Sequence, residues 1–551
     1  MKKNKYLLLF ASLSVLALLT GAAIQENFLK DWRRIQVQGQ TDDGPIAVQL
    51  RQVVNNNLGV ADRCVSCHVS MAPGEQSVRG APLLVAHKPV VHDPADYGCT
   101  VCHGGQGQAT EKLDAHGDVH FWPEPMLDKA TLYAGCGTCH VALHVPEQSR
   151  LQKASLAFER LDCYACHRVD GKGGTLRPDQ GGMEGPNLSR VGATAFDSEW
   201  YPKHLAKSAA ATAGPWKTAF RTIAAEDLPL LGDFLQTRVA ASQLVAAKST
   251  FFSSGCLGCH KVSGVGGDAG PDLTKAGFKD PGLVSFEHVP GDGSIKNWMA
   301  EHFRAPASVV AGSLMPPAPL SDKEIDQLTF FTLSLRRKDL GDLYLPKDRI
   351  RAVKFGEREF ATDGATLYGA FCAGCHGRDG QGRRLPGLVS FPSIANPDYL
   401  AIAPDALLAK TVELGRPGRR MPGWLKPDGL RAEEMKTVVA YIRTLGATEM
   451  EEDPKPARWV TAAPIAGKRI FASACAGCHG PDAKGAEGPA LNNPVLLDAA
   501  TDTFLVETVA RGRKGTAMAS FLEPSPVRSA LTRADIESVV AYLRSLQGGK
   551  S

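Results

Sequence analysis

One long apolar run stands near the start of the chain, directly behind a short lysine-rich stretch. Residues 6–24 are apolar apart from two serines, one threonine and one glycine. As a helix they span about 28 Å, close to the thickness of the hydrocarbon core of a membrane. Residues 1–24 are therefore predicted to be a membrane anchor or a cleaved signal segment, and the anchor is preferred. Either alternative exports the rest of the chain from the cytoplasm.

Beyond this run, the hydrophobic positions follow a pattern that repeats four times. Each repeat begins with a short helix and ends with an amphipathic helix whose acidic first turn suits the helix dipole. The leading helices are expected at residues 151–161, 244–253, 365–371 and 465–474, and the closing helices at 225–238, 321–337, 431–445 and 532–546. Loops of Gly, Pro and Asx residues lie between them, at 185–188, 270–273, 386–388 and 488–491. The pattern predicts a mainly α fold that contains tandem small helical domains.

The composition is that of a folded protein, and it narrows the range of partners. Of the 551 residues, 43% are hydrophobic and 22% are charged, which is typical of globular domains. The formal net charge of +4 is too small to indicate nucleic acid as a partner. The feature that decides the chemistry is the set of 14 cysteines.

All 14 cysteines belong to one pattern, Cys-x-x-Cys-His, which occurs seven times. The pairs are Cys64 and Cys67, Cys99 and Cys102, Cys136 and Cys139, Cys163 and Cys166, Cys256 and Cys259, Cys372 and Cys375, and Cys475 and Cys478. The histidines that follow them are His68, His103, His140, His167, His260, His376 and His479. This pattern is the attachment signature of c-type haem, in which two thiols bond to the haem vinyl groups and the histidine ligates the iron. Zinc sites or thiol redox pairs do not explain seven such copies with no spare cysteine. We therefore predict seven covalently attached haem c groups.

The spacing of the motifs indicates two kinds of region. The first four motifs begin close together along the chain, whereas the last three are widely separated. Crowded motifs leave no room for a separate apolar core, so residues 25–148 are expected to form a loop-rich trihaem segment with haem in its interior. Widely spaced motifs allow each haem its own small helical domain.

The four repeats resemble class I cytochrome c domains in the order of leading helix, motif, Gly-Pro-Asx loop and closing helix. The resemblance implies domains at residues 149–242, 243–340, 356–447 and 463–548. In that family the sixth iron ligand is a methionine shortly before the closing helix, which implies Met315, Met421 and Met518. The fourth haem departs from the pattern, because Lys217 aligns with Met315 and His204 aligns with His302 of the next repeat. Its sixth ligand is therefore His204, Lys217 or neither, in which case the iron is open.

Residues 25–143 resemble a different family, the membrane-anchored multihaem cytochromes that often partner cytochrome b-type quinol-oxidising complexes. The strings Asp62–His68 and Tyr97–Gly107 carry this resemblance. It implies that His87, His92 and His116 are the second axial ligands of the first three haems. Which iron each of them serves stays open, and His120 and His144 are spare.

The ligand sets predict a direction for electron flow. A histidine–methionine pair raises the potential of a haem above that of a bis-histidine pair. Electrons are therefore expected to enter near the membrane and to leave from the C-terminal domains. We interpret the chain as an electron-transfer subunit in the cytoplasmic membrane, with its haem domains on the periplasmic side, rather than as a catalyst by itself. Its expected donor is a cytochrome b-type or other quinol-oxidising membrane subunit, and its expected acceptor is a soluble cytochrome or a terminal reductase.

Two other functions remain as alternatives. One is a haem reductase or peroxidase that uses an open site at the fourth haem. The other is an extracellular electron conduit that assembles haem chains between subunits. Two basic clusters, Arg416, Arg419 and Arg420, and then Arg511, Arg513 and Lys514, are interpreted as solvated faces, with an acidic partner or haem propionates as the alternative.

Chemical haem analysis combined with EPR tests the motif count. We expect seven haems per chain in the oxidised, membrane-extracted protein. An iron with two protein ligands is closed to small molecules and low-spin, so seven low-spin haems would support electron transfer alone. A high-spin component near one haem per chain would instead favour the enzyme.

Overall fold

The computed structural model describes residues 2–120, 122–140, 143–174, 185–193, 223–383 and 391–548. The chain divides into two compact units, each assembled from segments that are distant in the sequence. The first unit comprises Met1–Val141, Lys275–His302 and Thr329–Ile350, and the second comprises Ala142–Thr274, Phe303–Leu328 and Arg351–Ser551. The six predicted domain ranges divide the chain more finely and stay predictions.

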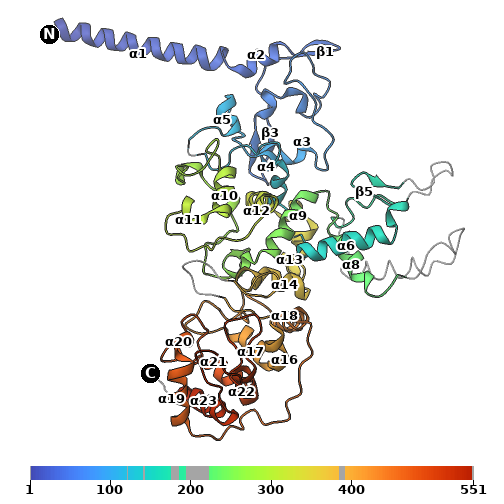
Figure 1. Cartoon of the computed structure of the whole chain (residues 1–551). Coiled ribbons are helices and arrows are strands. Elements are labelled where there is room, and N and C mark those ends of the chain that lie inside the picture. Colours follow the sequence, from blue (N-terminus) through green and yellow to red (C-terminus); the bar gives the residue numbers. More distant parts are fainter. Residues whose placement is uncertain are drawn as a thin grey trace, which may run out of the picture. The chain divides into compact units, whose positions relative to one another are not determined.

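The first unit begins with one long helix, α1 (Lys2–Phe28), drawn in blue in Figure 1. The most apolar 18-residue window within Lys3–Val37 has a mean hydropathy of 2.4, and none of that window is buried inside the protein. At 1.5 Å per residue α1 extends for about 40 Å, which is enough to cross a membrane. The predicted N-terminal membrane helix is confirmed.

The rest of the first unit contains only short elements, as expected of a loop-rich segment. Its helices and helical turns are α2 (Asp31–Val37), η1 (Cys64–Ser66), η2 (Val69–Met71), α3 (Pro94–Tyr97), α4 (Thr100–His103), α5 (Lys112–His116), η3 (Leu132–Thr138), η7 (Ala276–Phe278), η8 (Pro281–Leu283) and η9 (Asp342–Tyr344). Its strands form two antiparallel hairpins, β1 (Gln40–Thr41) with β2 (Gly44–Pro45) and β3 (Val53–Asn55) with β4 (Val60–Asp62). Three helices have residues in both units: α10 (Ile295–Arg304), α12 (Asp322–Ser334) and α13 (Lys347–Phe355).

The second unit contains the predicted helical repeats. Its leading helices are α6 (Gln148–Arg160), α9 (Ser242–Ser253), α14 (Gly364–Phe371) and α19 (Pro464–Ala474). Its closing helices are α8 (Asp227–Gln236), α18 (Ala432–Leu445) and α23 (Arg533–Ser545), followed by the turn η10 (Leu546–Gly548). Between them lie η4 (Cys163–Ala165), η6 (Cys256–Gly258), α11 (Pro306–Val309), α15 (Ala373–His376), α16 (Pro397–Ile402), α17 (Asp405–Leu414), α20 (Ala476–His479), α21 (Pro494–Ala499) and α22 (Asp502–Arg511). The strands β5 (Arg168–Val169) and β6 (Lys172–Gly173) form one antiparallel hairpin, and β7 (Lys261–Val262) and β8 (Val265–Gly266) form another.

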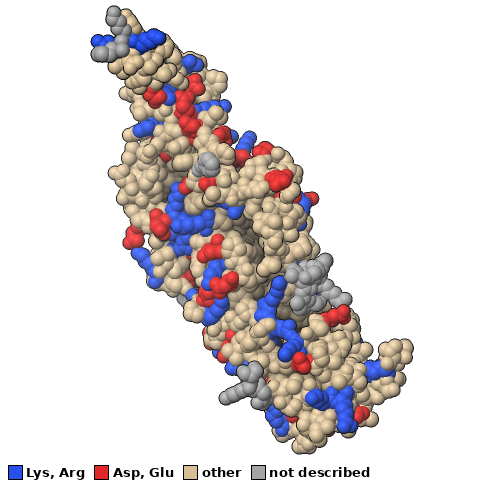
Figure 2. Space-filling model, turned by 90° about the vertical axis from the view of Figure 1, so that its left-hand side faces the viewer, with Lys and Arg blue, Asp and Glu red and all other residues tan. Residues whose placement is uncertain are grey.

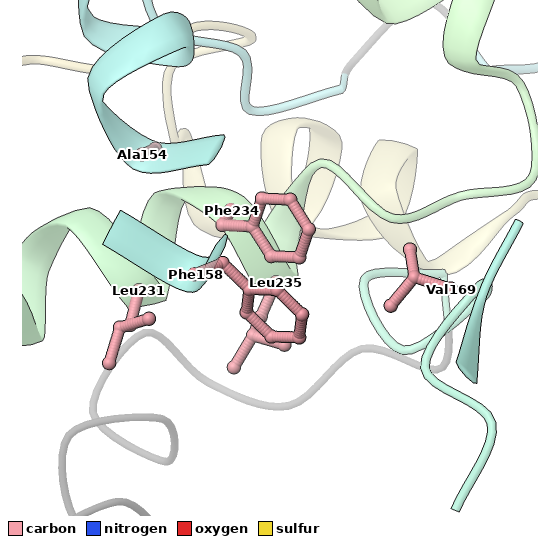
Figure 3. Packing of buried hydrophobic residues seen from close by; sticks show 6 residues of the cluster. All are labelled: Ala154, Phe158, Val169, Leu231, Phe234 and Leu235. Atoms are coloured by element: carbon pink, nitrogen blue, oxygen red, sulfur yellow. The ribbon is translucent and has the colours of Figure 1, made fainter. Parts of the chain in front are cut away.

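Each leading helix with a described closing helix inside this unit packs against it: α6 against α8, α14 against α18, and α19 against α23. In the first pair Phe158 and Phe234 stack with ring centroids 4.1 Å apart, and Ala154, Val169, Leu231 and Leu235 complete the cluster (Figure 3). The mainly α fold with small helical repeats is confirmed.

The closing helices begin where their sequences supply caps. The Thr532 hydroxyl accepts the Asp535 N–H, and the Asp535 carboxylate accepts the Thr532 N–H in return. This reciprocal capping box satisfies two backbone donors that have no partner inside the helix. Helix α18 uses Glu434 in the same place, and there the carboxylate also binds an arginine.

Arg358 and Glu434 form a buried, bidentate ion pair in the domain of the sixth motif. Arg358 Nε and Nη2 each lie 2.7 Å from a Glu434 carboxylate oxygen, and both side chains are only 7% exposed. Burial by itself raises the pKa of Glu434, but hydrogen bonds from Arg358 and the Arg431 N–H outweigh it, so the pKa is lowered.

Substitution of Arg358 by alanine is expected to destabilise this domain by about 3–5 kcal/mol, because a buried carboxylate loses its partner. Hydrogen–deuterium exchange of the α18 amides measures the effect in the full-length protein. Lys436→Ala, which breaks an exposed pair with Glu433, is the matched control and should leave α18 exchange unchanged. The ion pair contributes above the ordinary carboxyl pKa and is lost as pH falls through the lowered pKa. Equal protection in both variants would contradict the prediction.

Candidate haem centres

Each of the seven motifs forms a single turn of helix. The histidine N–H donates to the carbonyl of the first cysteine in every copy, at 2.8–3.0 Å: His68 to Cys64, His103 to Cys99, His140 to Cys136, His167 to Cys163, His260 to Cys256, His376 to Cys372, and His479 to Cys475. Residues three and four apart share one face of a helix, so both thiols and the imidazole point the same way. All 14 cysteines are free of disulfide bonds. The geometry fits two thioether bonds and one axial ligand.

In four motifs a proline carbonyl orients the imidazole. The Nδ1 atoms of His167, His260, His376 and His479 lie 2.8–3.0 Å from the carbonyl oxygens of Pro186, Pro271, Pro392 and Pro489, respectively. When Nδ1–H donates to a carbonyl, Nε2 keeps its lone pair for a metal. The predicted loops at 185–188, 270–273 and 488–491 supply three of these prolines. The predicted loop at 386–388 lies outside the described residues, and Pro392 provides the carbonyl in that domain.

The glycine before the proline is required by close approach. A Cβ built on Gly488 would lie 2.9 Å from both Cε1 and Nδ1 of His479. Gly270 and Gly185 would meet His260 and His167 at still shorter distances. The glycine therefore makes room for the imidazole, and the proline supplies the carbonyl oxygen that orients it.

In the first unit, further histidines lie opposite two of the motif histidines. The ring centroids of His87 and His103 are 6.3 Å apart, and those of His92 and His140 are 6.0 Å apart. Burial, and then the nearby charge of His87, lowers the pKa of His103. These separations leave room for one metal ion between each pair of rings.

A third histidine, His116, stands close to the remaining motif. Burial, followed by the charge of His116, lowers the pKa of His68. The spare histidines differ from these: His120 is exposed, and His144 belongs to the second unit, where burial lowers its pKa to about 4. The structure thus places His87 and His92 opposite two of the motif histidines, and His116 within electrostatic range of the third.

His140 is oriented differently from the four histidines bound to proline carbonyls. Its Nδ1 lies 3.1 Å from Oδ1 of Asp348, a residue 208 positions downstream. No sequence signal points to this aspartate, because it lies in a segment between two predicted domains.

The loops that carry Met421 and Met518 share a geometry that follows a repeat in the sequence. Both read Gly-Arg-x-Gly-x-x-Met, beginning at Gly415 and Gly512. The N–H of the arginine donates to the methionine carbonyl in both, at 2.8 Å from Arg416 and 2.7 Å from Arg513. The first glycine of each repeat has a positive φ, which favours glycine. This repeat is a signal in the sequence that links the two methionine loops to each other.

The remaining predicted sixth ligands are less fully described. Met315 lies half-buried, with its N–H 3.3 Å from the Ser313 hydroxyl. The candidates for the fourth haem, His204 and Lys217, lie outside the described residues. The three alternatives for that iron therefore stay open.

Neighbouring motifs touch one another directly. In the first unit, the side chains of Cys64 and Cys99 are within hydrogen-bonding distance. A Cβ on Gly135, beside the third motif, would lie 2.0 Å from the carbonyl oxygen of Cys102 in the second. The three motifs of this unit therefore form a continuous series.

The fifth and sixth motifs meet through a reciprocal contact in the second unit. The side chains of Cys259 and Cys375, which occupy the same place in their motifs, lie next to each other. A Cβ on Gly374 would lie 2.6 Å from the Gly255 carbonyl oxygen, and one on Gly258 would lie 2.9 Å from that of Phe371. Because Gly258 corresponds to Gly374 and Gly255 to Phe371, the two motifs are related by an approximate twofold axis.

A second reciprocal contact joins the last two domains, and we call it the C-terminal interface. Helix α16 packs against α22, and α17 packs against α21, the corresponding helices (Figure 1). Asn396 Nδ2 donates to the Lys514 carbonyl at 2.9 Å, and its counterpart Asn493 donates to the Pro417 carbonyl at 3.1 Å. Both acceptors follow the arginine of the repeat that leads to the methionine.

Two arginines at the C-terminal interface are not solvated, and for them the sequence interpretation was wrong. Burial lowers the pKa of Arg416, and it lowers the pKa of Arg513 to about 10. Arg513 lies over the rings of Tyr399 and Phe504. Arg416 Nη1 is buried with no hydrogen-bond partner among the described residues. A haem propionate is an anion of the kind that this donor lacks, so the residues present fit the group that the motifs imply.

The other members of the two basic clusters lie at the surface. Arg419, Arg420 and Lys514 are exposed. Arg511 is also exposed and pairs with Glu451 and Glu507. For these residues the interpretation as an exposed face agrees with the structure, although Arg511 has acidic partners of its own.

Comparison with known proteins gives two family matches. The family described as cytochrome c matches residues 245–336 and 465–547. The family described as cytochrome C oxidase, cbb3-type, subunit III matches residues 359–442.

Several curated proteins are similar to about a third of the chain. The cbb3-type cytochrome c oxidase subunit FixP of Bradyrhizobium diazoefficiens is 28% identical over 199 residues, which are 34% of this chain and 61% of that protein. The subunit CcoP of Rhodobacter capsulatus is 28% identical over 208 residues, 34% of this chain and 62% of that protein. The subunit CcoP of Rubrivivax gelatinosus is 33% identical over 135 residues, 24% and 36% of the two chains. This chain thus spans about three fifths of the length of the first two relatives.

Among solved structures, one similarity does not indicate a shared fold. A chain of the Kuenenia stuttgartiensis reducing HAO-like protein complex Kustc0457/Kustc0458 is 21% identical, with 33% of this chain and 94% of that chain covered. Its TM-score is 0.22.

The fit of Gly488 against His479 is open to a direct test. Gly488→Ala is expected to displace the His479 imidazole, because the new Cβ would lie 2.9 Å from two of its ring atoms. His479 is only 8% exposed, so the ring has little room to move away within its site. One haem should then lose its axial histidine and become high-spin, which EPR detects. Gly477→Ala, in the same motif but with open space around its Cβ, is the matched control. A low-spin Gly488→Ala variant would contradict the proposed role of this glycine.

Proposed function

Because the chain is a membrane-anchored multihaem c-type cytochrome that contains cytochrome c domains, we propose that it is the electron-transfer subunit of a respiratory membrane complex. Haem c supplies one-electron redox chemistry when bound. The chain's own residues attach it, orient its axial ligands and hold neighbouring centres in contact. The proposal includes haem at all seven motifs, and the shared helical turn of these motifs supports that number.

The first three centres are bis-histidine in this proposal. His116 serves the motif of His68, His87 that of His103, and His92 that of His140. Two metal–nitrogen bonds of about 2 Å, with each nitrogen about 1.1 Å from its ring centroid, place two axial imidazoles about 6 Å apart. The centroid separations of 6.3 Å and 6.0 Å support this pairing for the second and third centres. For the first centre the support is the electrostatic proximity of His116 to His68.

The last three centres are histidine–methionine, with Met315, Met421 and Met518 as sixth ligands. The matching Gly-Arg-x-Gly-x-x-Met loops support this for Met421 and Met518, because one backbone hydrogen bond fixes both methionines in the same way. For Met315 the support is its position before α12 in a segment that matches the cytochrome c family. The fourth centre keeps its three alternatives.

The order of ligand types gives the route a direction. Bis-histidine centres stand in the unit that carries α1, and histidine–methionine centres stand in the second unit. Because a thioether favours the reduced iron more than an imidazole does, electrons enter near the membrane and leave through the C-terminal domains. The donor in this proposal is a cytochrome b-type or other quinol-oxidising membrane subunit.

The acceptor in this proposal is a soluble cytochrome or a terminal reductase on the periplasmic side. The names of the relatives, subunits of cbb3-type cytochrome c oxidases, support membership of a respiratory complex. The surface charge fits a redox partner better than nucleic acid, because Lys and Arg patches lie next to Asp and Glu groups on the face in Figure 2 and the net charge is +4. The contrast between facing histidine pairs in one unit and methionine loops in the other is the observation that carries the proposal.

Spectropotentiometric titration of the full-length protein, with single ligand replacements, tests the direction. Met421→His should lower the potential of one component of the high-potential group, and His92→Met should raise one component of the low-potential group. Met450→Leu is the control, because this exposed methionine has no place in a ligand loop. The proposal fails if the components that respond to Met421→His belong to the low-potential group, or if His92→Met leaves the titration unchanged.

A further inference from the structure

Five of the motif histidines have a hydrogen-bond partner at Nδ1 among the described side chains and carbonyls, and of these His140 alone faces a carboxylate. Its Nδ1 lies 3.1 Å from Oδ1 of Asp348, whereas the other four face proline carbonyls. The two side chains are 25% and 16% exposed. This pair lies within the first unit, where the proposed distal ligand His92 stands on the other side of the same centre.

The segment that carries Asp348 is held firmly against the trihaem region. A Cβ on Gly137, inside the third motif, would lie 1.9 Å from the Ser334 carbonyl oxygen, so the two backbones are in direct contact. Asn55 Nδ2 lies 2.6 Å from the Tyr344 hydroxyl, and the rings of Tyr97 and Tyr344 meet edge to face at 5.6 Å. These contacts bring a carboxylate from far along the chain to the motif.

The first turn of α13 then fixes the side chain. Arg349, which is 3% exposed, donates from Nη1 to the Lys338 carbonyl at 3.0 Å and ties the turn back to its own segment. The second oxygen of the carboxylate, Asp348 Oδ2, is buried and has no hydrogen-bond partner among the described residues. No donor among the described residues thus binds Oδ2, and the hydrogen bond of this carboxylate goes from its Oδ1 to the His140 imidazole.

We propose that Asp348 is a positioning residue that makes the third haem the most reducing centre of the chain. A carboxylate that accepts the Nδ1–H bond increases the basicity of the imidazole more than a neutral carbonyl does. A more basic axial ligand stabilises the oxidised iron, which lowers the reduction potential. This inference rests on the proposed function, because it takes His140 and His92 as the two ligands of that iron.

Such a centre has a definite role in the route. The third motif is the last of the trihaem series, and a low potential there retains electrons on the first two centres until the acceptor side is oxidised. The segment between the predicted domains at residues 243–340 and 356–447 therefore carries the carboxylate that sets the potential of the third haem.

Asp348→Asn tests the inference, because the amide keeps the shape of the side chain and removes its charge. We expect the lowest component of the potentiometric titration of the full-length protein to rise. A tenfold change in the preference for oxidised over reduced iron corresponds to about 59 mV for one electron, which is the expected order of the shift. Asp348→Glu, which keeps a carboxylate, should recover part of the difference. Asp339→Asn, an exposed aspartate of the same segment, controls for the loss of one charge.

EPR and near-infrared magnetic circular dichroism separate the possible failures. If the wild-type protein has three bis-histidine signals and Asp348→Asn leaves every potential at the value found in Asp339→Asn, the role of Asp348 is overturned while the proposed function stands. If the wild-type protein lacks three bis-histidine signals, the proposed ligand set itself is wrong. A rise in one low component with the bis-histidine signals retained supports both. A purely structural role for Asp348 predicts loss of haem or a high-spin signal instead, which would also overturn the inference.

Discussion

Each Cys-x-x-Cys-His motif is closed into one turn of helix, and this turn governs how the chain around it can fold. A single backbone hydrogen bond from the histidine to the first cysteine places two thiols and one imidazole on the same side. Once a large rigid group is attached there, the surrounding chain has to provide walls for it and an orienting acceptor for Nδ1. The Gly-Pro pairs follow from this requirement, because they give the imidazole both space and an acceptor.

The structure uses the remaining surface of the motifs and loops to join centres. The domain of the sixth motif makes contacts on two different surfaces. Its motif meets the fifth motif, and its methionine loop takes part in the C-terminal interface. Both contacts are reciprocal, since two copies of the same sequence pattern present the same backbone groups to each other. Asn396 and Asn493 illustrate the principle, because each caps its own helix and also binds the partner loop. Such contacts hold successive domains at fixed separations without a large apolar core.

The charged residues divide according to whether they face water or the cofactor region. Arg416 and Arg513 are half-buried at the C-terminal interface, whereas Arg419 and Arg420 are exposed only a few positions away. Their sequence environment is the same, and only the packing of a second domain over one side of the loop separates the two classes. Asp348 shows the same dependence, because its meaning comes entirely from a neighbour 208 residues away.

From the amino-acid sequence we could predict the membrane helix, the mainly α class, the leading and closing helices of the repeats and the seven attachment motifs. These features are local: an apolar run, a 3.6-residue period or a five-residue spacing specifies them without reference to distant residues. The sequence also indicated three histidines, but it could not assign them to motifs, because loops without periodicity carry no information about which distant groups they approach. The folded chain was needed to show that His87 faces His103, that His92 faces His140, and that Asp348 stands behind His140. These pairings depend on the closure of long loops, which the summed packing of the whole unit selects.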